Sequence, residues 1–559
     1  MINNSLKKIK IWLVATVIIV SSITLVAFDD SVNFEIAKNL DIYYTLFREL
    51  NLYYVDETKP GDLIKKSIDA MLHSLDPYTV YIPESQMEDF RFMTTGQYGG
   101  VGALIREDGD YIVITEPYEG FPAQKNDIRA GDVILAVDGL SIKGKSTSEV
   151  SELLKGQPKT KINLKLKRHG ITEPIEKTIE REEIKIDAVQ YYGVVSDSIG
   201  YINLSSFTES SYIEVKNALT KLKENAAVKY LIFDLRRNPG GLLIEAVNIT
   251  NLFVSKSEII VSTKGKVKDW DKVYTGMMTP IAPEIPIAVL VNSGSASASE
   301  IVSGAIQDLD RGVVIGQRTF GKGLVQTTRP LSYNAKLKVT TAKYYTPSGR
   351  CIQALDYTHR NPDGSVGKVP DSLVTPFKTK NGRIVYDGGG VTPDINVEVE
   401  QFSNIKASLL TKNLIFDFAT LYTIQHQSIP EITKFTITDE IYGQFIDFLK
   451  DKDFDYQSES EENLKTLMQT AKEEKYYDLV KNEAEILKTK LAHDKNKDLQ
   501  VFKEEIKQSV FQEIASRYYF QKGRIKALLI SDPVIKEAIA VLQDKTRYKL
   551  VLSGQSTNK

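Results

Sequence analysis

Residues 286–326 constrain the fold of this chain more than any other stretch of the sequence. A short and almost wholly apolar run, Ile287–Val291, predicts a strand that is covered on both faces. A turn rich in serine, glycine and alanine follows, and the apolar residues of segment 298–309 then recur at helical spacing. A second short strand at residues 313–315 leads into a glycine-rich loop at residues 319–323. This order predicts a strand–helix–strand unit at the centre of an α/β domain.

Three serines, Ser295, Ser297 and Ser299, lie where this strand turns into this helix. The free N–H groups and the positive end of the helix can stabilise an oxyanion beside such a serine. The same serines could instead act only as helix caps. Lys322 favours catalysis, because it lies between two glycines after a buried strand, and a desolvated amine can act as a base for serine. No histidine is near in the sequence, so a Ser–Lys dyad is the available arrangement.

The segments GSASASEI and TFGKGLVQ resemble two motifs of the carboxyl-terminal processing peptidases, which are also called tail-specific proteases. This resemblance implies a serine endopeptidase. It assigns the nucleophile to Ser297, the middle serine of SASASE, and the general base to Lys322, the lysine of FGKG. It also implies that Gln326 orients the lysine amine.

A second loop, with the sequence DLRRNPGGL, follows another predicted strand. Its Pro-Gly-Gly turn leaves the backbone open to a ligand, because glycine has no side chain to block the approach. The resemblance assigns one N–H group of an oxyanion hole to Gly240 or Gly241 and the second to Ala298. An ordinary turn between a strand and a helix is the alternative. Glu300 reads as a carboxylate that favours a helix N-terminus.

The catalytic core is predicted at residues 183–400. From residue 200 onward, segments with strand and helix patterns alternate, which implies crossover connections and a largely parallel central sheet. By resemblance, the core has a crotonase-like, Clp-protease-like fold. Segment Lys336–Tyr345 alternates as a strand does, and residues 356–379 read as an irregular surface loop with a possible hairpin.

Residues 96–182 are predicted to form a small β domain inserted before this core. The phrase AGDVILAVDG at residues 130–139 resembles the PDZ pattern. The backbone N–H groups of Gly100, Val101 and Gly102 can then hold a chain-terminal carboxylate, and the peptide adds as a strand beside Ala103. A β domain that binds no ligand is the alternative.

Residues 1–30 resemble an export signal or an N-terminal membrane anchor. Lysines within residues 7–10 precede an uncharged run at residues 11–28. The positive-inside rule places the lysines in the cytoplasm and the rest of the chain on the extracytoplasmic, periplasmic side. An uncleaved anchor is slightly favoured, because the sequence after the run is a poor cleavage site. A helical region is predicted next, at residues 31–95.

Residues 401–559 are predicted to form a charged helical extension that reaches beyond the common core of the family. Apolar stripes indicate its helices at residues 405–423, 440–449, 502–520 and 533–542. A packing or oligomerisation domain is the favoured interpretation, and a platform for an adaptor protein is the alternative.

Composition and residue spacing limit which partners and cofactors the sequence predicts. The formal net charge of −2 gives no reason to expect a nucleic-acid partner. A single cysteine, Cys351, excludes an internal disulfide. The histidines lack metal-ligand spacing and no Walker-type phosphate loop is present, so neither a metal nor a cofactor is predicted.

The sequence as a whole predicts an exported or membrane-anchored α/β multidomain serine endopeptidase. It would capture the C-termini of protein substrates through the PDZ-like module and cleave them at Ser297. A non-catalytic peptide-binding scaffold is one alternative, but the complete set of serine, lysine, glutamine and glycine loop argues against it. A crotonase-type acyl-CoA enzyme is the other, and the PDZ-like insert disfavours it. A homo-oligomer and a regulatory adaptor remain open.

Overall fold

The computed structural model describes residues 32–196, 198–225, 227–361, 363–398, 402–491 and 495–554. The predicted signal or anchor at residues 1–30 lies outside these ranges. Within them, no helix has both the length and the apolar character needed to cross a membrane. The chain divides into two compact units, Met1–Tyr81 and Ile82–Lys559.

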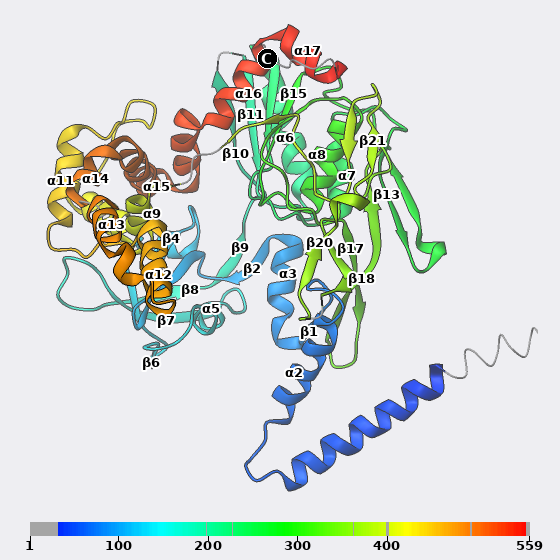
Figure 1. Ribbon diagram of the computed structural model, residues 1–559, viewed down its shortest axis with the longest axis horizontal. Helices are drawn as coiled ribbons and strands as arrows, with labels where there is room; N and C mark the ends of the chain where they lie inside the picture. Colours follow the sequence, from blue (N-terminus) through cyan, green and yellow to red (C-terminus); the bar gives the residue numbers. More distant parts are fainter. Residues whose placement is uncertain are drawn as a thin grey trace, which may run out of the picture. The chain divides into compact units, whose positions relative to one another are not determined.

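The first unit is helical where it is described. A helix at residues 32–53 and helix α2 (Pro60–His73) are joined by a short connection (Figure 1). The proline at the first position of α2 suits a helix start, because its fixed backbone angle is helical and its missing N–H would have no partner there. The hydroxyl groups of Tyr43 and Ser67 are hydrogen-bonded at 2.6 Å between the two helices. The helices expected in this region are confirmed.

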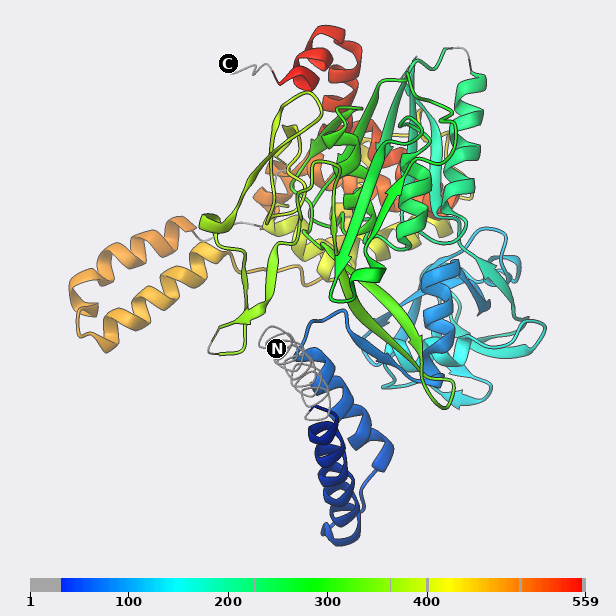
Figure 2. The same cartoon turned by 90° about the vertical axis from the view of Figure 1, so that its right-hand side faces the viewer.

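The second unit is built around a mostly parallel sheet with the strand order β10-β11-β12-β15-β16-β23 (Figures 1 and 2). Strand β10 is antiparallel to its neighbour, and the other neighbouring strands are parallel. The predicted alternation of strands and helices is therefore confirmed. The strands are β10 (Val189–Ser196), β11 (Ile199–Leu204), β12 (Tyr230–Asp234), β15 (Ile287–Val291), β16 (Val313–Gly316) and β23 (Ile395–Asn396).

Helices cover both faces of this sheet. Apolar residues of α6 (Ser211–Glu224), α7 (Leu243–Thr250) and α8 (Ala298–Asp308) form the core on one face. The other face is covered by α16 (Pro533–Gln543), with α17 (Lys545–Ser553) beside it, at the far end of the helical tail. This two-sided cover explains why strand β15 is apolar along its whole length.

A second, antiparallel sheet lies beside the first. In it, β18 pairs with both β13 and β17, and β13 pairs with β14. In Figure 1 the long β17–β18 ribbon extends away from the parallel sheet toward α3. Its elements are β13 (Ile259–Gly265), η2 (Lys268–Trp270), β14 (Lys272–Thr275), β17 (Leu324–Pro330) and β18 (Lys336–Tyr345).

The predicted β domain has its own sheet, with the strand order β3-β4-β5-β7-β8 and β6 paired to β5. A separate pair of strands, β2 and β9, leads into and out of this domain. The elements from the unit boundary onward are β1 (Val80–Ile82), η1 (Glu84–Gln86), α3 (Met87–Thr95), β2 (Gln97–Gly100), β3 (Ala103–Asp108), β4 (Tyr111–Pro117), α4 (Pro122–Lys125), β5 (Val133–Val137), β6 (Leu140–Ser141), α5 (Thr147–Leu154), β7 (Lys161–Lys167), β8 (Ile175–Glu180) and β9 (Glu182–Lys185).

The region expected to be an irregular loop contains two short hairpins. The first is β19 with β20 and the second is β21 with β22. Arg350 ties the start of this region to the end of α8, because its guanidinium donates to Asp308 at 2.8 Å and both side chains are fully buried. The elements are β19 (Leu355–Arg360), β20 (Val366–Lys368), η3 (Asp371–Leu373), β21 (Pro376–Lys378) and β22 (Ile384–Tyr386).

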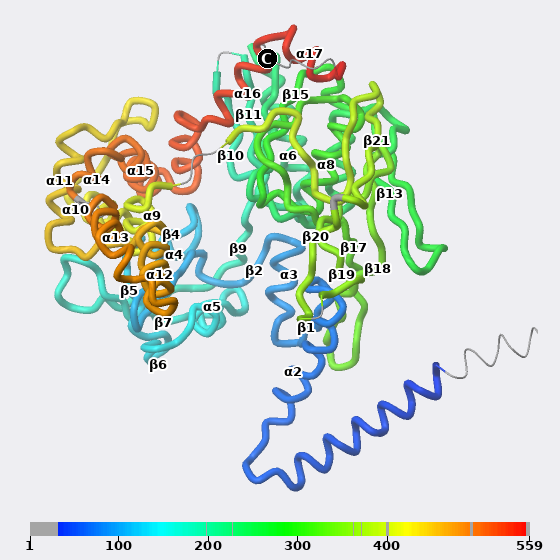
Figure 3. Tube along the Cα trace, in the orientation of Figure 1, coloured from blue at the N-terminus to red at the C-terminus, as the bar shows by residue number. Residues whose placement is uncertain are grey.

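The tail is helical, but two of its expected helices differ from the prediction. The stripe at residues 405–423 is divided between α9 and α10, because Asn413 adopts a left-handed backbone conformation that ends the first helix. Helix α15 runs beyond residue 520, and its direction changes at Phe520, which has a φ of 51° (Figure 3). The helices are α9 (Asn404–Thr411), α10 (Leu414–Gln425), α11 (Asp439–Leu449), α12 (Glu459–Glu473), α13 (Tyr477–Leu491), α14 (Lys495–Val501) and α15 (Lys503–Ser531).

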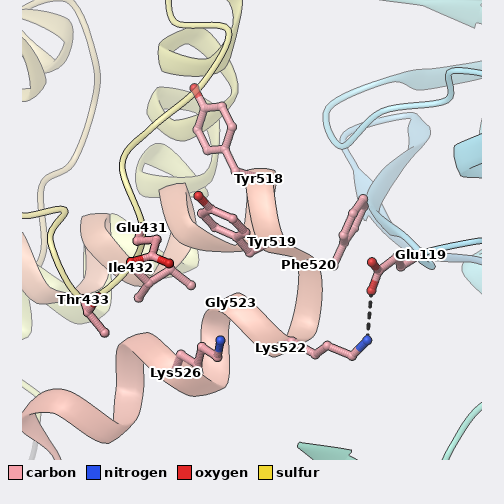
Figure 4. Close-up of a pocket in the computed structure, with 10 residues that line it drawn as sticks. All are labelled: Glu119, Glu431, Ile432, Thr433, Tyr518, Tyr519, Phe520, Lys522, Gly523 and Lys526. Atoms are coloured by element: carbon pink, nitrogen blue, oxygen red, sulfur yellow. Dashed lines mark hydrogen bonds and ion pairs between the residues drawn. The ribbon is translucent and has the colours of Figure 1, made fainter.

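The bend in α15 borders the β domain. A cavity of about 450 Å³ lies at the bend, and Phe520 and Lys522 line it together with Glu119 of the β domain (Figure 4). Lys522 donates to Glu119 at 3.2 Å. Nearby, Arg524 forms an ion pair at 3.0 Å with the buried Glu116 of strand β4. Charged contacts therefore join the tail to the strands of the β domain.

The Arg350–Asp308 pair gives a test of the core. Asp308→Ala leaves a buried guanidinium without its charge partner, so we expect the free energy of unfolding to fall by about 3–5 kcal/mol. Urea denaturation monitored by fluorescence measures this loss. Asp447→Ala removes a partner from an exposed pair with Lys450 and should leave the unfolding midpoint unchanged. Equal effects of the two substitutions would contradict the assigned role of the buried pair.

Candidate active site

Ser297 lies at the turn between the buried strand β15 and helix α8, as the sequence predicts. Its backbone angles are φ 54° and ψ −111°, a region that residues with a Cβ atom rarely adopt. Such a conformation costs about 1–3 kcal/mol and persists only where the surrounding structure enforces it. Strain of this kind is common at catalytic turns, so the conformation sets Ser297 apart from an ordinary helix cap.

The three serines of the turn have different environments. Ser295 and Ser299 are fully buried, and their hydroxyl groups donate to the backbone carbonyls of Leu235 at 2.8 Å and Asn238 at 2.9 Å. Ser297 is partly exposed. Two of the candidate serines thus hold the turn against the neighbouring loop, and Ser297 is the one that solvent or a substrate can reach.

Glu300 joins the serine turn to the lysine loop. Its carboxylate accepts hydrogen bonds from the N–H groups of Ser297 at 2.8 Å and Lys322 at 2.9 Å. It also accepts from the N–H of Gly321 at 2.7 Å and from the hydroxyl of Thr319 at 2.6 Å. Burial raises the pKa of Glu300 to about 7, and these hydrogen bonds act in the opposite direction. The sequence interpretation of Glu300 as a helix-terminal carboxylate did not include this link.

Tyr344 makes a second link between the same two residues. Its hydroxyl group lies 2.6 Å from the carbonyl oxygen of Lys322 and 3.1 Å from that of Ser297. The tyrosine is almost fully buried on strand β18. Glu300 and Tyr344 thus bind the N–H and C=O groups of both residues, which fixes the two backbones next to each other. The alternating pattern of residues 336–345 predicted the strand but not this contact.

The glycine loop of residues 238–241 packs directly on the serine turn. A Cβ atom on Gly240 would lie 2.8 Å from Cβ of Ser297 and 2.7 Å from the carbonyl oxygen of Ala296. Only glycine fits at this distance. The buried side chain of Asn238 orients the loop, because it donates to the carbonyl of Leu204 at 2.8 Å and accepts from the N–H of Gly240 at 2.9 Å.

The backbone N–H groups around Ser297 differ in their availability. The N–H of Gly240 is used by Asn238, whereas the N–H groups of Gly241 and Ala298 donate to no acceptor within the described part of the chain. Available N–H groups in the serine turn and in the loop that packs on it suit an oxyanion. Of the two glycines that the sequence left open, Gly241 is therefore the better candidate.

Gln326 lies on β17, four positions after Lys322, and its amide donates to the hydroxyl of Thr340 at 3.1 Å. Residues 324–330 pair with β18, whose residue Tyr344 contacts the Lys322 carbonyl. The structure therefore brings Ser297, Lys322 and the glycine loop together through backbone contacts, and Gln326 follows on the adjoining strand.

The predicted carboxylate-binding loop lies between β2 and β3. The carbonyl groups of Val101 and Gly102 accept from the N–H groups of Ala123 at 2.8 Å and Tyr118 at 2.9 Å. Among the described residues, the N–H groups of Val101 and Gly102 have no such acceptor. Gly102 has a φ of 75°, which is accessible to glycine. Successive available N–H groups of this kind suit an anion.

Comparisons with known proteins identify the family of this chain. A family model described as peptidase family S41 matches residues 198–366, and a PDZ-domain model matches residues 113–168. The carboxy-terminal-processing protease of Bartonella bacilliformis is 37% identical to this chain over 353 residues, which cover 62% of this chain and 81% of that protein. This chain belongs to the carboxy-terminal-processing proteases of peptidase family S41. It is a serine-type peptidase with a PDZ domain, and the scaffold and acyl-CoA alternatives are not favoured.

Other relatives are similar to this protease over comparable lengths. A probable CtpA-like serine protease of Staphylococcus aureus is 36% identical over 365 residues, which cover 63% of this chain and 72% of that protein. Among solved structures, the photosystem II D1 C-terminal processing protease is 29% identical and covers 64% of this chain and 86% of that chain, with a TM-score of 0.35. The assignment to the family rests on the sequence comparisons, because a structural similarity with this TM-score gives it no support.

The helical tail of the protease also has a counterpart. Residues 405–542 match a model described as a probable PDZ-protease C-terminal helical domain. The sequence analysis placed this tail beyond the common core of the family, and the match now associates it with other PDZ-containing proteases.

The strained backbone of Ser297 predicts opposite effects of one substitution on stability and activity. Ser297→Gly removes the hydroxyl group and relieves the strain, so peptide hydrolysis should be lost. Its free energy of unfolding should exceed that of Ser297→Ala by about 1 kcal/mol, because alanine keeps the Cβ atom in the same conformation. Thermal and chemical denaturation of the two variants test this prediction. Equal stability would show that the turn is not strained.

Glu300→Gln tests the link between the two catalytic segments. The amide places an N–H group where the carboxylate accepts one, so both segments should shift and proteolysis should fall by about 10²-fold. Glu245→Gln alters a buried carboxylate on α7 that accepts from the N–H of Tyr212, and it serves as the matched control. Similar activity losses in the two variants would contradict a specific role for Glu300.

The raised pKa of Glu300 also predicts how stability and activity vary with pH. Between about 4.5 and about 7, the folded protein holds a proton on Glu300 that the unfolded chain releases. The contribution of this group to stability is therefore present at low pH and is lost as the pH rises through about 7. Activity should change in the opposite sense, because the carboxylate is the form that accepts from both segments. The free energy of unfolding and the rate of proteolysis would be measured against pH for the parent and for Glu300→Gln. The pH dependence that comes from Glu300 should be absent in the variant.

Proposed function

We propose that this protease hydrolyses peptide bonds with a Ser297–Lys322 dyad. The observation that carries the proposal is the Glu300 carboxylate, which hydrogen-bonds to the backbone N–H groups of both residues. The strained and partly exposed Ser297 and the available N–H groups of Gly241 and Ala298 also support it.

In the proposed mechanism, Oγ of Ser297 attacks the scissile carbonyl carbon while the neutral amine of Lys322 accepts the hydroxyl proton. The N–H groups of Gly241 and Ala298 stabilise the oxyanion, and the loss of one such donor costs about 3 kcal/mol of transition-state stabilisation. The C–N bond then breaks, and the Lys322 ammonium protonates the leaving amine. Water attacks the acyl ester, gives a proton to Lys322 and releases the acid, and that proton returns to Ser297. Gln326 helps to position the lysine amine.

The PDZ domain supplies the substrate in this proposal. The N–H groups of Val101 and Gly102 hold the terminal carboxylate, and the peptide adds as a strand beside Ala103. Gly100 and Gly102 keep the loop open, because side chains there would meet Tyr98 and Phe121. The substrates are proteins or peptides with accessible C-termini.

The cellular location is a further part of the proposal. The lysines before the uncharged run at residues 11–28 support export, with the protease on the extracytoplasmic side and the N-terminus in the membrane. An assembly of several copies and an adaptor that binds the tail remain predictions.

Proteolysis by purified full-length protein tests the dyad. We would incubate the parent, Ser297→Ala and Lys322→Ala in detergent with an unfolded protein that ends in apolar residues. Lys343→Ala replaces an exposed lysine on β18 and serves as the matched control. Cleavage by the parent and Lys343→Ala alone is the expected result, and amidation of the substrate C-terminus should slow it. Equal cleavage by all four proteins would contradict the catalytic roles proposed for Ser297 and Lys322.

A further inference from the structure

Arg236 and Arg237 form the sharp turn that leads from strand β12 into the glycine loop. The N–H of Asn238 donates to the carbonyl of Leu235 at 3.2 Å and closes this turn. Arg237 has a φ of 60°, a left-handed conformation that is uncommon for a residue with a Cβ atom. Such a conformation persists only where neighbouring groups enforce it. The turn directly precedes Asn238, which holds the N–H of Gly240, so support of the turn bears on the whole loop.

The guanidinium of Arg236 joins this turn to two carboxylates. Its Nη2 donates to Asp234 at 2.7 Å, and its Nη1 donates to Asp532 at 2.6 Å. The side chain of Arg236 is 19% exposed, and those of Asp234 and Asp532 are 3% and 13% exposed. The hydroxyl of Tyr201 also donates to Asp234, at 2.8 Å. Because little water reaches these groups, the attraction between the charges is less screened than in an exposed pair.

Asp532 belongs to the helical tail and lies 296 positions after Arg236 in the chain. Its two carboxylate oxygens have separate partners. Oδ1 accepts from the N–H groups of Val534 at 2.8 Å and Ile535 at 3.2 Å and thereby caps helix α16. Oδ2 accepts from Arg236. Capping uses one oxygen only, so the ion pair with the turn is a contribution that the helix itself does not require.

A displacement of the turn would reach both sides of the proposed oxyanion hole. The carbonyl of Asn238 accepts from the N–H of Ala296 at 3.0 Å and from the hydroxyl of Ser299 at 2.9 Å. The carbonyl of Leu235 accepts from the hydroxyl of Ser295 at 2.8 Å. The turn therefore contacts the serine turn as well as the glycine loop. A shift of about 1 Å in groups that position a reaction can lower its rate by about 10²-fold.

We propose that Asp532 is a positioning residue for peptide hydrolysis. Through Arg236 it fixes the turn that orients the glycine loop, and thereby the N–H of Gly241. This inference rests on the proposed function, in which that N–H stabilises the oxyanion. The tail thus supports the catalytic loop directly, in addition to covering one face of the sheet.

Asp532→Asn separates the ion pair from the helix cap. Asparagine caps helices about as well as aspartate, so Oδ1 still caps α16, whereas the amide turns N–H groups toward the guanidinium. We would measure hydrolysis of a fluorogenic peptide with an apolar C-terminus by the purified full-length protein in detergent. The expected result is a kcat about tenfold lower than that of the parent, with KM unchanged.

Asp544→Asn is the matched control. Asp544 caps helix α17 by accepting from the N–H groups of Thr546 at 3.0 Å and Arg547 at 2.9 Å, which repeats the cap made by Asp532. It forms no ion pair with another residue that the structure describes. The control should therefore keep the kcat and KM of the parent. An equal fall of kcat in both variants would overturn the inference, because it would assign the effect to the loss of a capping charge.

A peptide boronic acid gives a measurement that a merely structural role would not change. Its boron atom bonds to Oγ of Ser297, the serine proton passes to Lys322, and one oxygen of the tetrahedral adduct occupies the oxyanion hole. The dissociation constant of this adduct should rise about tenfold in Asp532→Asn and stay the same in Asp544→Asn. Binding of an unreactive peptide with an apolar C-terminus, measured by fluorescence anisotropy, should be unchanged in both variants.

Arg236→Gln completes a double-mutant cycle with Asp532→Asn. If Asp532 acts through Arg236, the double variant should lose no more kcat than Arg236→Gln alone. Losses that multiply would show that the two residues act separately, and the inference would then be wrong.

Two further outcomes distinguish this inference from the proposed function. If Ser297→Ala loses hydrolysis and boronate binding while Asp532→Asn keeps the kcat and boronate affinity of the parent, the inference is wrong and the proposed function stands. If Ser297→Ala still hydrolyses the peptide, the proposed nucleophile is wrong, and the inference that rests on it falls as well.

Discussion

The buried carboxylate of Glu300 holds the catalytic residues in place, and the geometry of the site depends on it. The two segments that it joins are separated along the chain by helix α8 and strand β16. Hydrogen bonds to a charged group contribute about 1.5–3 kcal/mol each, whereas burial of an isolated carboxylate costs several kcal/mol. The raised pKa of the group shows that the cost of burial outweighs the hydrogen bonds. Neither segment can move alone without leaving part of a buried charge unsatisfied.

Close packing around Ser297 makes a second constraint. Gly240 has no room for a side chain against the serine turn, and the hydroxyl groups of Ser295 and Ser299 anchor that turn to the neighbouring loop. The unfavourable backbone angles of Ser297 are maintained by this packing and by the fully buried strand and helix on either side. The packing of the surrounding core therefore offsets the cost of holding Ser297 in a conformation that it would not adopt alone.

The sequence predicted the parts of the site that are local. Strand β15, helix α8 and the position of Ser297 at their junction follow from short-range patterns, and the motif around Lys322 is contiguous. The contacts that assemble the site are between segments and could not be predicted in the same way. Glu300 lies within a recognised motif. Its hydrogen bonds to residues 319–322 form only because the folded chain brings that loop next to helix α8, and no local pattern predicts this. Tyr344 reaches the site from another sheet, and no pattern within its strand specifies that contact.

The same distinction applies to the fold. Alternating strands and helices predicted the parallel sheet, because each element carries its own periodicity. The amphipathic helix at residues 533–542 was also predictable, but not the surface that it covers. The break at Asn413 was missed, because the apolar stripe continues across it and only the backbone changes direction.

The position of helices α16 and α17 has a consequence for how the protein is made. One face of the catalytic sheet is covered by residues at the far end of the tail, and the hydroxyl of Tyr548 is hydrogen-bonded to the backbone of Ile287 at the start of β15. A growing chain cannot cover this face of the sheet that carries Ser297 until residues 533–553 have been synthesised. A chain that terminates before these helices would keep an uncovered apolar face.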